Sequence, residues 1–195
     1  MSPPARPATI VRSPQLADPA DDVKEFILTT FLDLSEMKTA HRSSGKTRPM
    51  PQETNVLGYC EEFSSEEFET ISRGLIPQDM DDKWFIYLEG NTLNLHRSWT
   101  GICIYQVEFA TDSGNHTVRR ALVNRDRNQY GGTDGDYDSK FLHFLISNLL
   151  LGKQVEFPMP TGVPGEIPKG AVQHEFSGTA YPEKPAEATP WWKFW

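Results

Sequence analysis

Six consecutive residues, from His96 to Gly101, concentrate side chains that can do chemistry. The arginine in this segment presents a fork of N–H donors that matches an oxyanion, and two hydroxyls and the turn amides add further donors. The histidine can serve as an acid, a base or a donor near neutral pH. The segment therefore predicts a site for a small anion. The alternative is a structural hairpin with Trp99 buried and Arg97 paired with an acid such as Glu89.

A second polar cluster runs from Asn124 to Tyr130, at the end of a predicted strand, where ligand-binding loops are often carried. In a meander sheet the ends of the second and fourth strands lie at the same edge, so the two clusters are expected to converge there. The alternative is that Asn124 and Asp126 make local turn hydrogen bonds. The candidate ligand-binding residues are His96, Arg97, Ser98, Thr100, Asn124, Arg125 and Asp126.

Two other segments resemble known binding motifs but lack residues that those motifs require. The acidic loop Asp134–Asp138 resembles the start of a calcium loop, but Ser139 stands where the sharp turn needs glycine, and Leu145 stands where the last acidic ligand belongs. Gly45-Lys46-Thr47 lacks the earlier glycine and the preceding strand of a phosphate loop. No metal site, no cofactor and no familiar catalytic triad is predicted. The stretch Thr39–Arg48 is expected to be an exposed loop, with a local basic patch as the alternative.

Four strands are expected to position the two clusters: Lys83–Glu89, Thr92–Ser98, Gly101–Thr111 and Thr117–Asp126. The turns between them are short, which makes neighbouring strands antiparallel. In the first strand Trp84, Ile86 and Leu88 face one side of the sheet, while Phe85 and Tyr87 face the other. In the third strand Cys103, Tyr105, Val107 and Phe109 share one face. Apolar residues on both faces imply that both are covered near the sheet centre.

Three helices are expected around this sheet. One runs from Pro19 to Met37, with apolar residues at helical spacing. A second begins at Ser64, where Ser64 and Glu67 form a capping box, and ends at Gly74. A third runs from Ser139 to Leu151, capped by Asp138 and nearly apolar all round, which predicts a buried helix.

The sequence thus predicts an α+β fold: a four- to five-stranded antiparallel meander sheet packed with three helices. Residues 1–18 are rich in proline and are expected to form a flexible leader, residues 19–157 one domain, and residues 158–195 an extended tail. Residues 38–58 are expected to be a long loop, and Val155–Phe157 a short edge strand. The tail ends in four aromatic residues, which are candidates for partner binding: Trp191, Trp192, Phe194 and Trp195.

Composition excludes some classes of protein. A net charge of -8 and a pI of about 5.1 argue against a nucleic-acid backbone as the main partner. Cys60 and Cys103 are too few for a disulfide framework, so a reducing cytoplasm is expected. No signal peptide and no integral membrane segment are predicted, so the chain is expected to be soluble.

The stretch WFIYLEGNTLNLHRSWTGICIYQ, together with the later VNRDRNQY, resembles a poorly characterised group of small bacterial proteins. Their hairpin carries an aromatic-or-His–Arg–Ser–Trp–Thr–Gly motif, and some are associated with ADP-ribosylglycohydrolases. The resemblance covers roughly Asp79 to Leu151. It implies a role near ADP-ribose or NAD chemistry, in which a phosphate-bearing ligand is bound by Arg97, Ser98, Thr100, Asn124 and Arg125. The chain lacks the acidic metal-binding motifs of the glycohydrolase, so that activity is not implied.

Three functions remain in view. The first is a small binding or accessory module that holds a phosphate-bearing ligand, nucleotide-like or ADP-ribose-like, at the sheet edge. The second is a protein-interaction module or enzyme inhibitor that uses the acidic surface and the aromatic tail. The third is a small hydrolase or transferase with His96 as base. The sequence leaves open whether the chain is an enzyme.

Overall fold

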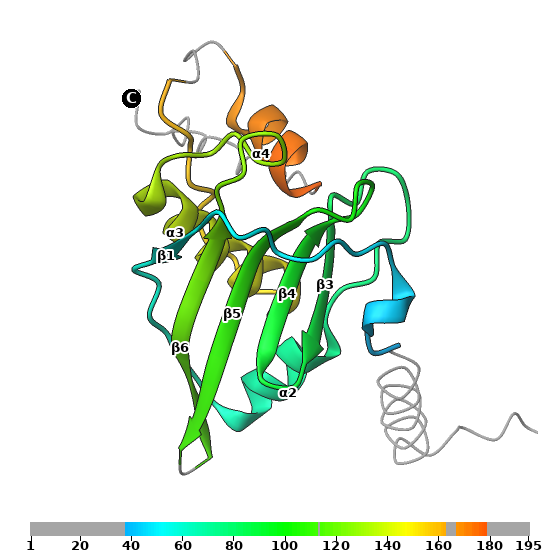
Figure 1. The fold of residues 1–195 in the computed structure, drawn as a ribbon, viewed down its shortest axis with the longest axis vertical. Coiled ribbons are helices and arrows are strands. Elements are labelled where there is room, and N and C mark those ends of the chain that lie inside the picture. Colours follow the sequence, from blue (N-terminus) through cyan, green and yellow to red (C-terminus); the bar gives the residue numbers. More distant parts are fainter. Residues whose placement is uncertain (1–37, 113, 163–166, 179–195) are drawn as a thin grey trace, which may run out of the picture. The chain divides into compact units, whose positions relative to one another are not determined.

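A six-stranded antiparallel sheet forms the frame of the protein (Figure 1). The structure, a computed structural model, describes residues 38–112, 114–162 and 167–178. In the described chain the strands are β1 (Thr54–Leu57), β2 (Glu62–Phe63), β3 (Trp84–Glu89), β4 (Thr92–Arg97), β5 (Cys103–Asp112) and β6 (Asn115–Asn124). The helical elements are η1 (Arg42–Ser44), α2 (Ser65–Arg73), α3 (Gly135–Phe144), the π-helical η2 (Leu145–Leu150) that continues α3, and α4 (Lys169–Ser177).

The strand order β1-β6-β5-β4-β3 contains the predicted meander, with β1 and β2 both paired to the outer edge of β6. The turn after β3 uses Gly90 at a φ of 59°, a left-handed conformation that suits glycine in a tight hairpin. The predicted α+β class with an antiparallel sheet is confirmed. Short turns carried this prediction, because they leave antiparallel pairing as the only connection that the chain can make.

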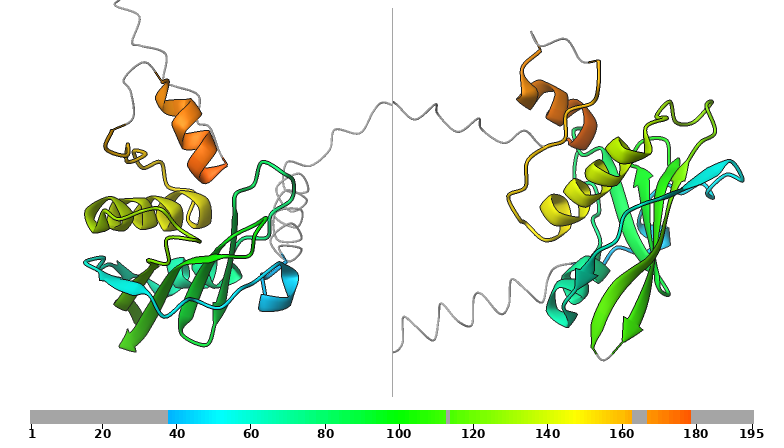
Figure 2. Two further views of the ribbon diagram at one scale, coloured as in Figure 1. Left: turned by 45° about the horizontal axis from the view of Figure 1, so that its top comes forward. Right: turned by 90° about the vertical axis from the view of Figure 1, so that its left-hand side faces the viewer.

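The main core lies between one face of the sheet and the helices α2 and α3 (Figure 2). Trp84 and Ile86 point into this core, whereas Phe85 and Tyr87 join a smaller cluster on the opposite, outer face. The predicted alternation along β3 is therefore confirmed. The segment before β1 crosses the outer face and covers part of it (Figure 1).

Helix α2 begins as predicted. The Ser64 hydroxyl accepts a hydrogen bond from the Glu67 amide, and the Glu67 carboxylate accepts one from the Ser64 amide. This reciprocal capping satisfies two amides that a helix start otherwise leaves without a partner. The helix ends at Gly74, also as predicted.

Helix α3 starts four residues earlier than predicted. Its N-cap is Asp134, whose carboxylate accepts hydrogen bonds from the amides of Asp136 and Tyr137. The prediction of Asp138 as cap is wrong, because Asp138 lies one turn inside the helix and is fully buried. Asp134 and Asp138 are both aspartates that could cap the start of this helix. The hydrogen bonds of Asp138 to distant residues hold it inside the helix, which leaves Asp134 as the cap.

Asp138 is the acceptor of a buried network that joins α3 to the sheet. Tyr105 and Tyr130 each donate a hydroxyl hydrogen bond to Asp138 Oδ1, over 2.8 and 2.6 Å. The guanidinium of Arg125 lies 2.6 Å from Asp138 Oδ2 and also donates to the carbonyl of Gly132. A buried ion pair of this kind stabilises a fold only while both partners are present. The network therefore ties together β5, α3 and the loop that follows β6.

A β-bulge changes which side chains of β5 face the core. Leu95 pairs with Tyr105, but the next residue, His96, pairs with Cys103, which leaves Ile104 as an extra residue. Ile104 and Tyr105 both join the main core, while Cys103 lines a cavity on the outer face. The prediction that Cys103 shares a face with Tyr105 is wrong, because the extra residue reverses the alternation at that point.

Three other segments differ from expectation. Residues 38–58 contain η1 and β1 rather than loop alone, and Val155–Phe157 forms no strand. Helix α4 lies within the stretch expected to form an extended tail, and its Val172 joins the main core. The sequence signal for α4 is weak, because Val172 and Phe176 are its only large apolar residues.

No helix among residues 38–112, 114–162 and 167–178 is long and apolar enough to cross a membrane. The predicted helix Pro19–Met37, the leader and the aromatic end Trp191–Trp195 lie outside the described residues.

We predict that Asp138→Ala lowers the free energy of unfolding by about 3 to 5 kcal/mol, because it leaves the Arg125 guanidinium buried without its partner. The control is Asp136→Ala, which removes an exposed acid from the same helix and should cost about 1 kcal/mol or less. Urea unfolding of the two variants measures the difference. Equal losses would show that the network contributes nothing specific.

Candidate functional site

The predicted residues of the first cluster make internal contacts. The guanidinium of Arg97 donates to the carbonyl of Phe176 in α4 over 3.0 Å and lies 4.6 Å from the ring centre of Trp84. The Ser98 hydroxyl donates to the carbonyl of Asp82. Burial lowers the pKa of Arg97, against the opposing effect of nearby tyrosine hydroxyls. Arg97 and Ser98 thus hold β4 against the segments on either side of it.

The rest of that hairpin differs from the structural alternative. Trp99 is 54% exposed rather than buried, and the Lys83 ammonium lies 5.7 Å from its ring centre. Glu89 lies 3.8 Å from Arg42, not beside Arg97. The Thr100 hydroxyl accepts a hydrogen bond from the amide of Ile102 within the turn.

The second cluster makes the turn hydrogen bonds of the alternative reading. Asn124 is fully buried, donates to the carbonyl of Cys103 over 2.8 Å, and accepts from the amide of Asp126. The Asp126 carboxylate accepts from the amide of Asn128. The two clusters do approach one another, since Arg97 of the first interacts electrostatically with Tyr130 of the second, but they meet around the buried Tyr105 and the partly buried Tyr130. This arrangement supports the fold at that end of the sheet.

Two predicted site residues have incomplete hydrogen bonding among the described residues: Arg125, whose buried Nε has no partner, and His96, which lies at the outer face of the sheet. His96 is 2% exposed, and its ring stacks on Tyr87 with ring centres 5.5 Å apart. Nδ1 lies 2.9 Å from the carbonyl oxygen of Gly101. A carbonyl only accepts, so Nδ1 carries the proton, and in the neutral ring Nε2 is left with a lone pair. Nε2 is buried and has no hydrogen-bond partner among the described residues.

A segment that crosses the outer face, Arg42–Met50, here called the strap, covers His96. The amide of Arg48 donates to the carbonyl of Gly101 over 2.7 Å, which fixes the strap to the hairpin. Gly45 lies against the ring of Phe85, where an added Cβ would come within 2.8 Å of a ring carbon. Glycine therefore allows the strap to lie flat on the sheet.

Between the strap and the sheet lies a cavity of about 300 Å³, here called the outer-face cavity. It is lined by residues of the strap and of β3, β4 and β5: Arg42, Thr47, Arg48, Pro49, Met50, Tyr87, Glu89, Asn94, His96, Cys103 and Gln106. The amide of Gln106 donates to the side-chain oxygen of Asn94 over 2.8 Å, so these two are already paired. The cavity joins the predicted His96 to the basic patch of the strap.

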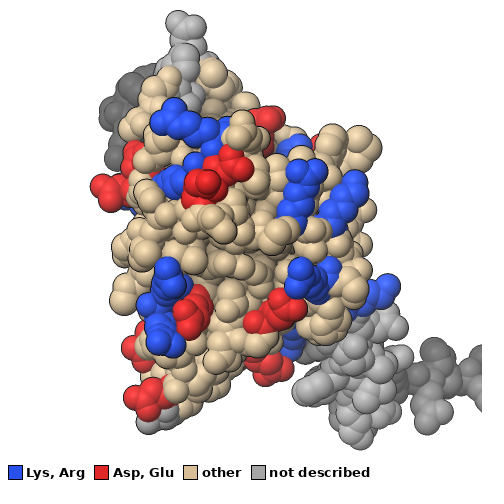
Figure 3. Space-filling model, in the orientation of Figure 1, with Lys and Arg blue, Asp and Glu red and all other residues tan. Residues whose placement is uncertain are grey.

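Charge around the cavity is predominantly positive. No acidic side chain among the described residues pairs with Arg48, and the contact of Arg42 with Glu89 is long and exposed. Figure 3 shows basic side chains gathered along the right-hand border of this face, where the strap and the ends of β3 and β4 lie, beside an uncharged middle. The protein as a whole has a net charge of -8, so the positive charge around this cavity is opposite in sign to the net charge.

Three titratable groups of the cavity, on His96, Cys103 and Tyr87, are neutral near pH 7. Burial lowers the pKa of His96 below 6.5, a shift that Arg42 reinforces and the bond to Gly101 opposes. Burial raises the pKa of the Cys103 thiol to about 12, and it also raises the pKa of Tyr87. A protonated thiol is a poor nucleophile. The pair of Cys103 and His96 therefore lacks the ionised form that cysteine catalysis uses.

Sequence reasoning found His96 but missed the residues that face it. Arg42 and Arg48 belong to a stretch whose basic side chains are visible in the sequence, yet nothing local indicates that it crosses the sheet. The link consists of long-range contacts, such as the bond from the Arg48 amide to the Gly101 carbonyl, between residues 53 positions apart. Cys103 reaches the cavity only through the bulge.

Comparison with models of protein families, with curated proteins and with solved structures gives no match in any of the three. The resemblance to the small bacterial proteins therefore stays an expectation. The functional argument depends on the geometry of the site.

We predict that His96 makes the protein less stable below pH 6.5. Its pKa is lower in the folded protein than in the unfolded chain, so protonation favours unfolding. The stability that the neutral ring contributes above pH 6.5 is lost as the pH falls toward the folded-state pKa. Between pH 7.5 and 5.5 the wild type should lose more unfolding free energy than His96→Asn, whose amide can keep the bond to Gly101. Parallel pH curves would contradict the assignment.

Proposed function

We propose that this protein is a binding module that holds a small oxyanion, such as the phosphate group of a larger ligand, in the outer-face cavity. The observation that carries the proposal is the buried, unpartnered Nε2 of His96 on the wall of a cavity that two arginines also line. A buried polar atom without a partner costs about 1 to 3 kcal/mol. An oxyanion pairs with Nε2 once Nε2 has taken up a proton, and this charged hydrogen bond offsets part of that cost.

Charge complementarity supports an anion. Arg48 has no ion-pair partner in the described part of the chain and Arg42 has a weak one, so the cavity offers two forks of donors suited to oxyanion oxygens. A bound anion would raise the pKa of His96 and favour its protonation, which turns Nε2 from an acceptor into a third donor. Binding of a fully ionised anion is then coupled to the uptake of one proton.

Size supports a small group rather than a whole dinucleotide. A volume of about 300 Å³ is at the lower end of ligand cavities. It has room for a phosphate and part of a sugar, with any remainder of the ligand outside. ADP-ribose and NAD, which the sequence resemblance suggests, enter the test as candidate ligands.

The other two functions have less support from the described residues. The aromatic end, Trp191–Trp195, lies outside them, so the protein-interaction module stays a prediction. A hydrolase with His96 as base would also need a nucleophile, and the neighbouring Cys103 thiol is protonated.

Sulfate is the sharpest first probe, because it stays a dianion across the whole pH range in which His96 titrates. Calorimetric titration should show sulfate binding to the wild type, reduced about tenfold or more in Arg48→Gln, which removes one charged donor. The matched control is Arg119→Gln, an exposed arginine paired with Glu108 on another part of the sheet. Phosphate, ADP-ribose and NAD follow under the same conditions. No heat with any of these anions, or equal affinities for the two variants, would refute the proposal.

The pH dependence tests the role of His96. Sulfate affinity should rise as the pH falls from 8 to 6, approaching tenfold per unit where the free ring is neutral. His96→Asn should bind sulfate weakly at every pH, whereas His116→Asn, a histidine on β6 outside the cavity, should keep the wild-type profile. A wild-type profile in His96→Asn would remove His96 from the site.

A further inference from the structure

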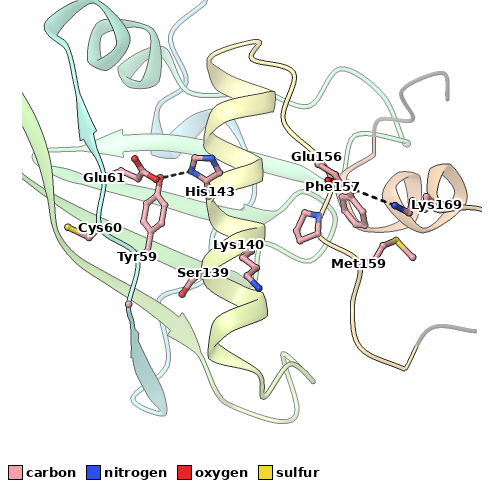
Figure 4. A pocket seen from close by; sticks show the side chains of 12 residues that line it. Tyr59, Cys60, Glu61, Ser139, Lys140, His143, Glu156, Phe157, Met159 and Lys169 are labelled. Atoms are coloured by element: carbon pink, nitrogen blue, oxygen red, sulfur yellow. Dashed lines mark hydrogen bonds and ion pairs between the residues drawn. The ribbon is translucent and has the colours of Figure 1, made fainter. Parts of the chain in front are cut away.

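A second concave surface, here called the α3 groove, lies over helix α3 on the other side of the sheet from the strap. Figure 4 shows α3 as its floor, the segment Gly58–Glu61 as one wall and Glu156–Met159 as the other. Its volume is about 600 Å³, and Lys169 from the start of α4 also lines it. Ser139, Lys140 and His143 contribute from α3, on the face that their spacing brings together.

Tyr59 places an unpaired donor in this groove. The residue is 8% exposed, and its hydroxyl is buried without a hydrogen-bond partner among the described residues. Figure 4 shows its side chain extending from the wall toward His143. Burial raises the pKa of Tyr59, and the carboxylate of Glu61 adds to the shift, so the hydroxyl stays protonated and can donate. The missing partner is therefore an acceptor.

One lysine of the groove, Lys140, makes no ion pair among the described residues. Glu61 lies 3.2 Å from Nδ1 of His143, and Glu156 lies 3.4 Å from the ammonium of Lys169. No acidic side chain in the described part of the chain pairs with Lys140. An acceptor that carries a single negative charge would match Lys140 and the Tyr59 hydroxyl together.

The opposite wall is apolar. Phe157, Pro158 and Met159 line it, and Phe157 is packed edge-on against the rings of Phe141 and Phe144 in the core. A rigid apolar wall facing a donor and a cation favours a ligand with a hydrocarbon body and one anionic end. A methionine adapts to bodies of different shape.

The groove also contains groups that resemble catalytic ones, but their geometry is wrong. Ser147, His143 and Glu61 form a chain in the order of a serine hydrolase, with 3.5 Å between Ser147 Oγ and His143 Nε2. Ser147 is 3% exposed and, unlike Tyr59, is not one of the residues that line the groove, so its hydroxyl does not meet a substrate there. Cys60 is exposed, but Figure 4 shows its sulfur turned away from His143. The arrangement suits binding rather than nucleophilic catalysis.

We infer that the α3 groove is a binding site for a monoanionic carboxylate with an apolar body, such as a medium-chain fatty acid or an aryl-alkanoic acid. The carboxylate lies between the Tyr59 hydroxyl and the Lys140 ammonium, and the apolar body lies along Phe157 and Met159. This site shares no residue with the outer-face cavity, so it stands or falls independently of the proposed anion site.

A series of related probes tests both halves of the ligand. Calorimetric titration should show octanoate binding at least tenfold more tightly than octanol, which lacks the charge, and than acetate, which lacks the apolar body. Octyl phosphate reports whether a second negative charge is tolerated and should bind no better than octanoate. Equal binding of octanol and octanoate would reduce the groove to an apolar surface and overturn the inference. No binding of octanoate would also overturn it.

Two substitutions locate the carboxylate. Tyr59→Phe removes one oxygen and should weaken octanoate binding about tenfold, and Lys140→Gln should do the same. The control is Lys153→Gln, a surface lysine that pairs with Glu67 away from the groove and should leave the affinity unchanged. Equal affinity in all three variants would place the ligand elsewhere.

Thermal unfolding separates a binding role from a structural one. Without ligand, Tyr59→Phe should unfold at the same temperature as the wild type or at a higher one, because it removes a buried hydroxyl that has no partner. With octanoate present, the wild type should gain more than the variant. A lower unfolding temperature for the ligand-free variant would mean that the hydroxyl has an internal partner, and it would overturn the inference.

Discussion

The carbonyl of Gly101 is the contact on which the outer face of the sheet depends. It accepts the amide of Arg48 over 2.7 Å and lies 2.9 Å from Nδ1 of His96, so one oxygen fixes both the strap and the histidine tautomer. Gly101 has a φ of 71°, and an added Cβ would come within 2.9 Å of the strap backbone at Lys46. A glycine is therefore required twice at this position, by the turn and by the close approach. Without that approach there would be no cavity over His96.

The same region shows that a cluster of polar residues in a sequence does not by itself distinguish a ligand-binding site from hydrogen bonds that support the fold. Arg97, Asn124 and Arg125 have the residue types of an anion site, yet each is used to hold a strand end, a turn or a helix. The arginine and asparagine side chains that would bind an anion are the same kinds of donor that hold the fold together. What separates them is the count of partners, which is complete for Asn124 and incomplete for His96. The number of hydrogen-bond partners of each group can be counted only once the three-dimensional structure is known.

The sequence predicted the strands β3 to β6 and helix α2 because their signals are local: short turns, alternating apolar residues and a capping box whose two residues are three positions apart. It did not predict β1 and β2, which are short and pair with β6 from a distance in the chain. The prediction from sequence failed where the local structure depends on contacts between residues far apart in the chain. Asp134 and Asp138 are equivalent as caps until the Arg125 pair buries the second of them. The bulge at Ile104 has no mark in the sequence, yet it moves Cys103 from the core to the outer face. The outer-face cavity and the α3 groove are each lined by segments far apart in the chain, and no local sequence pattern indicates that these segments meet.

The two candidate sites share one feature. Each contains a buried polar atom without a hydrogen-bond partner among the described residues, Nε2 of His96 in the outer-face cavity and the Tyr59 hydroxyl in the α3 groove. Each group costs the free protein about 1 to 3 kcal/mol as a buried polar atom without a partner. A ligand present at about a hundred times its dissociation constant contributes about 2.7 kcal/mol to the folded state. One bound ligand therefore offsets roughly the cost of one such group. This balance explains how a fold of ordinary stability can keep both groups, provided that each is occupied under the conditions in which the protein works.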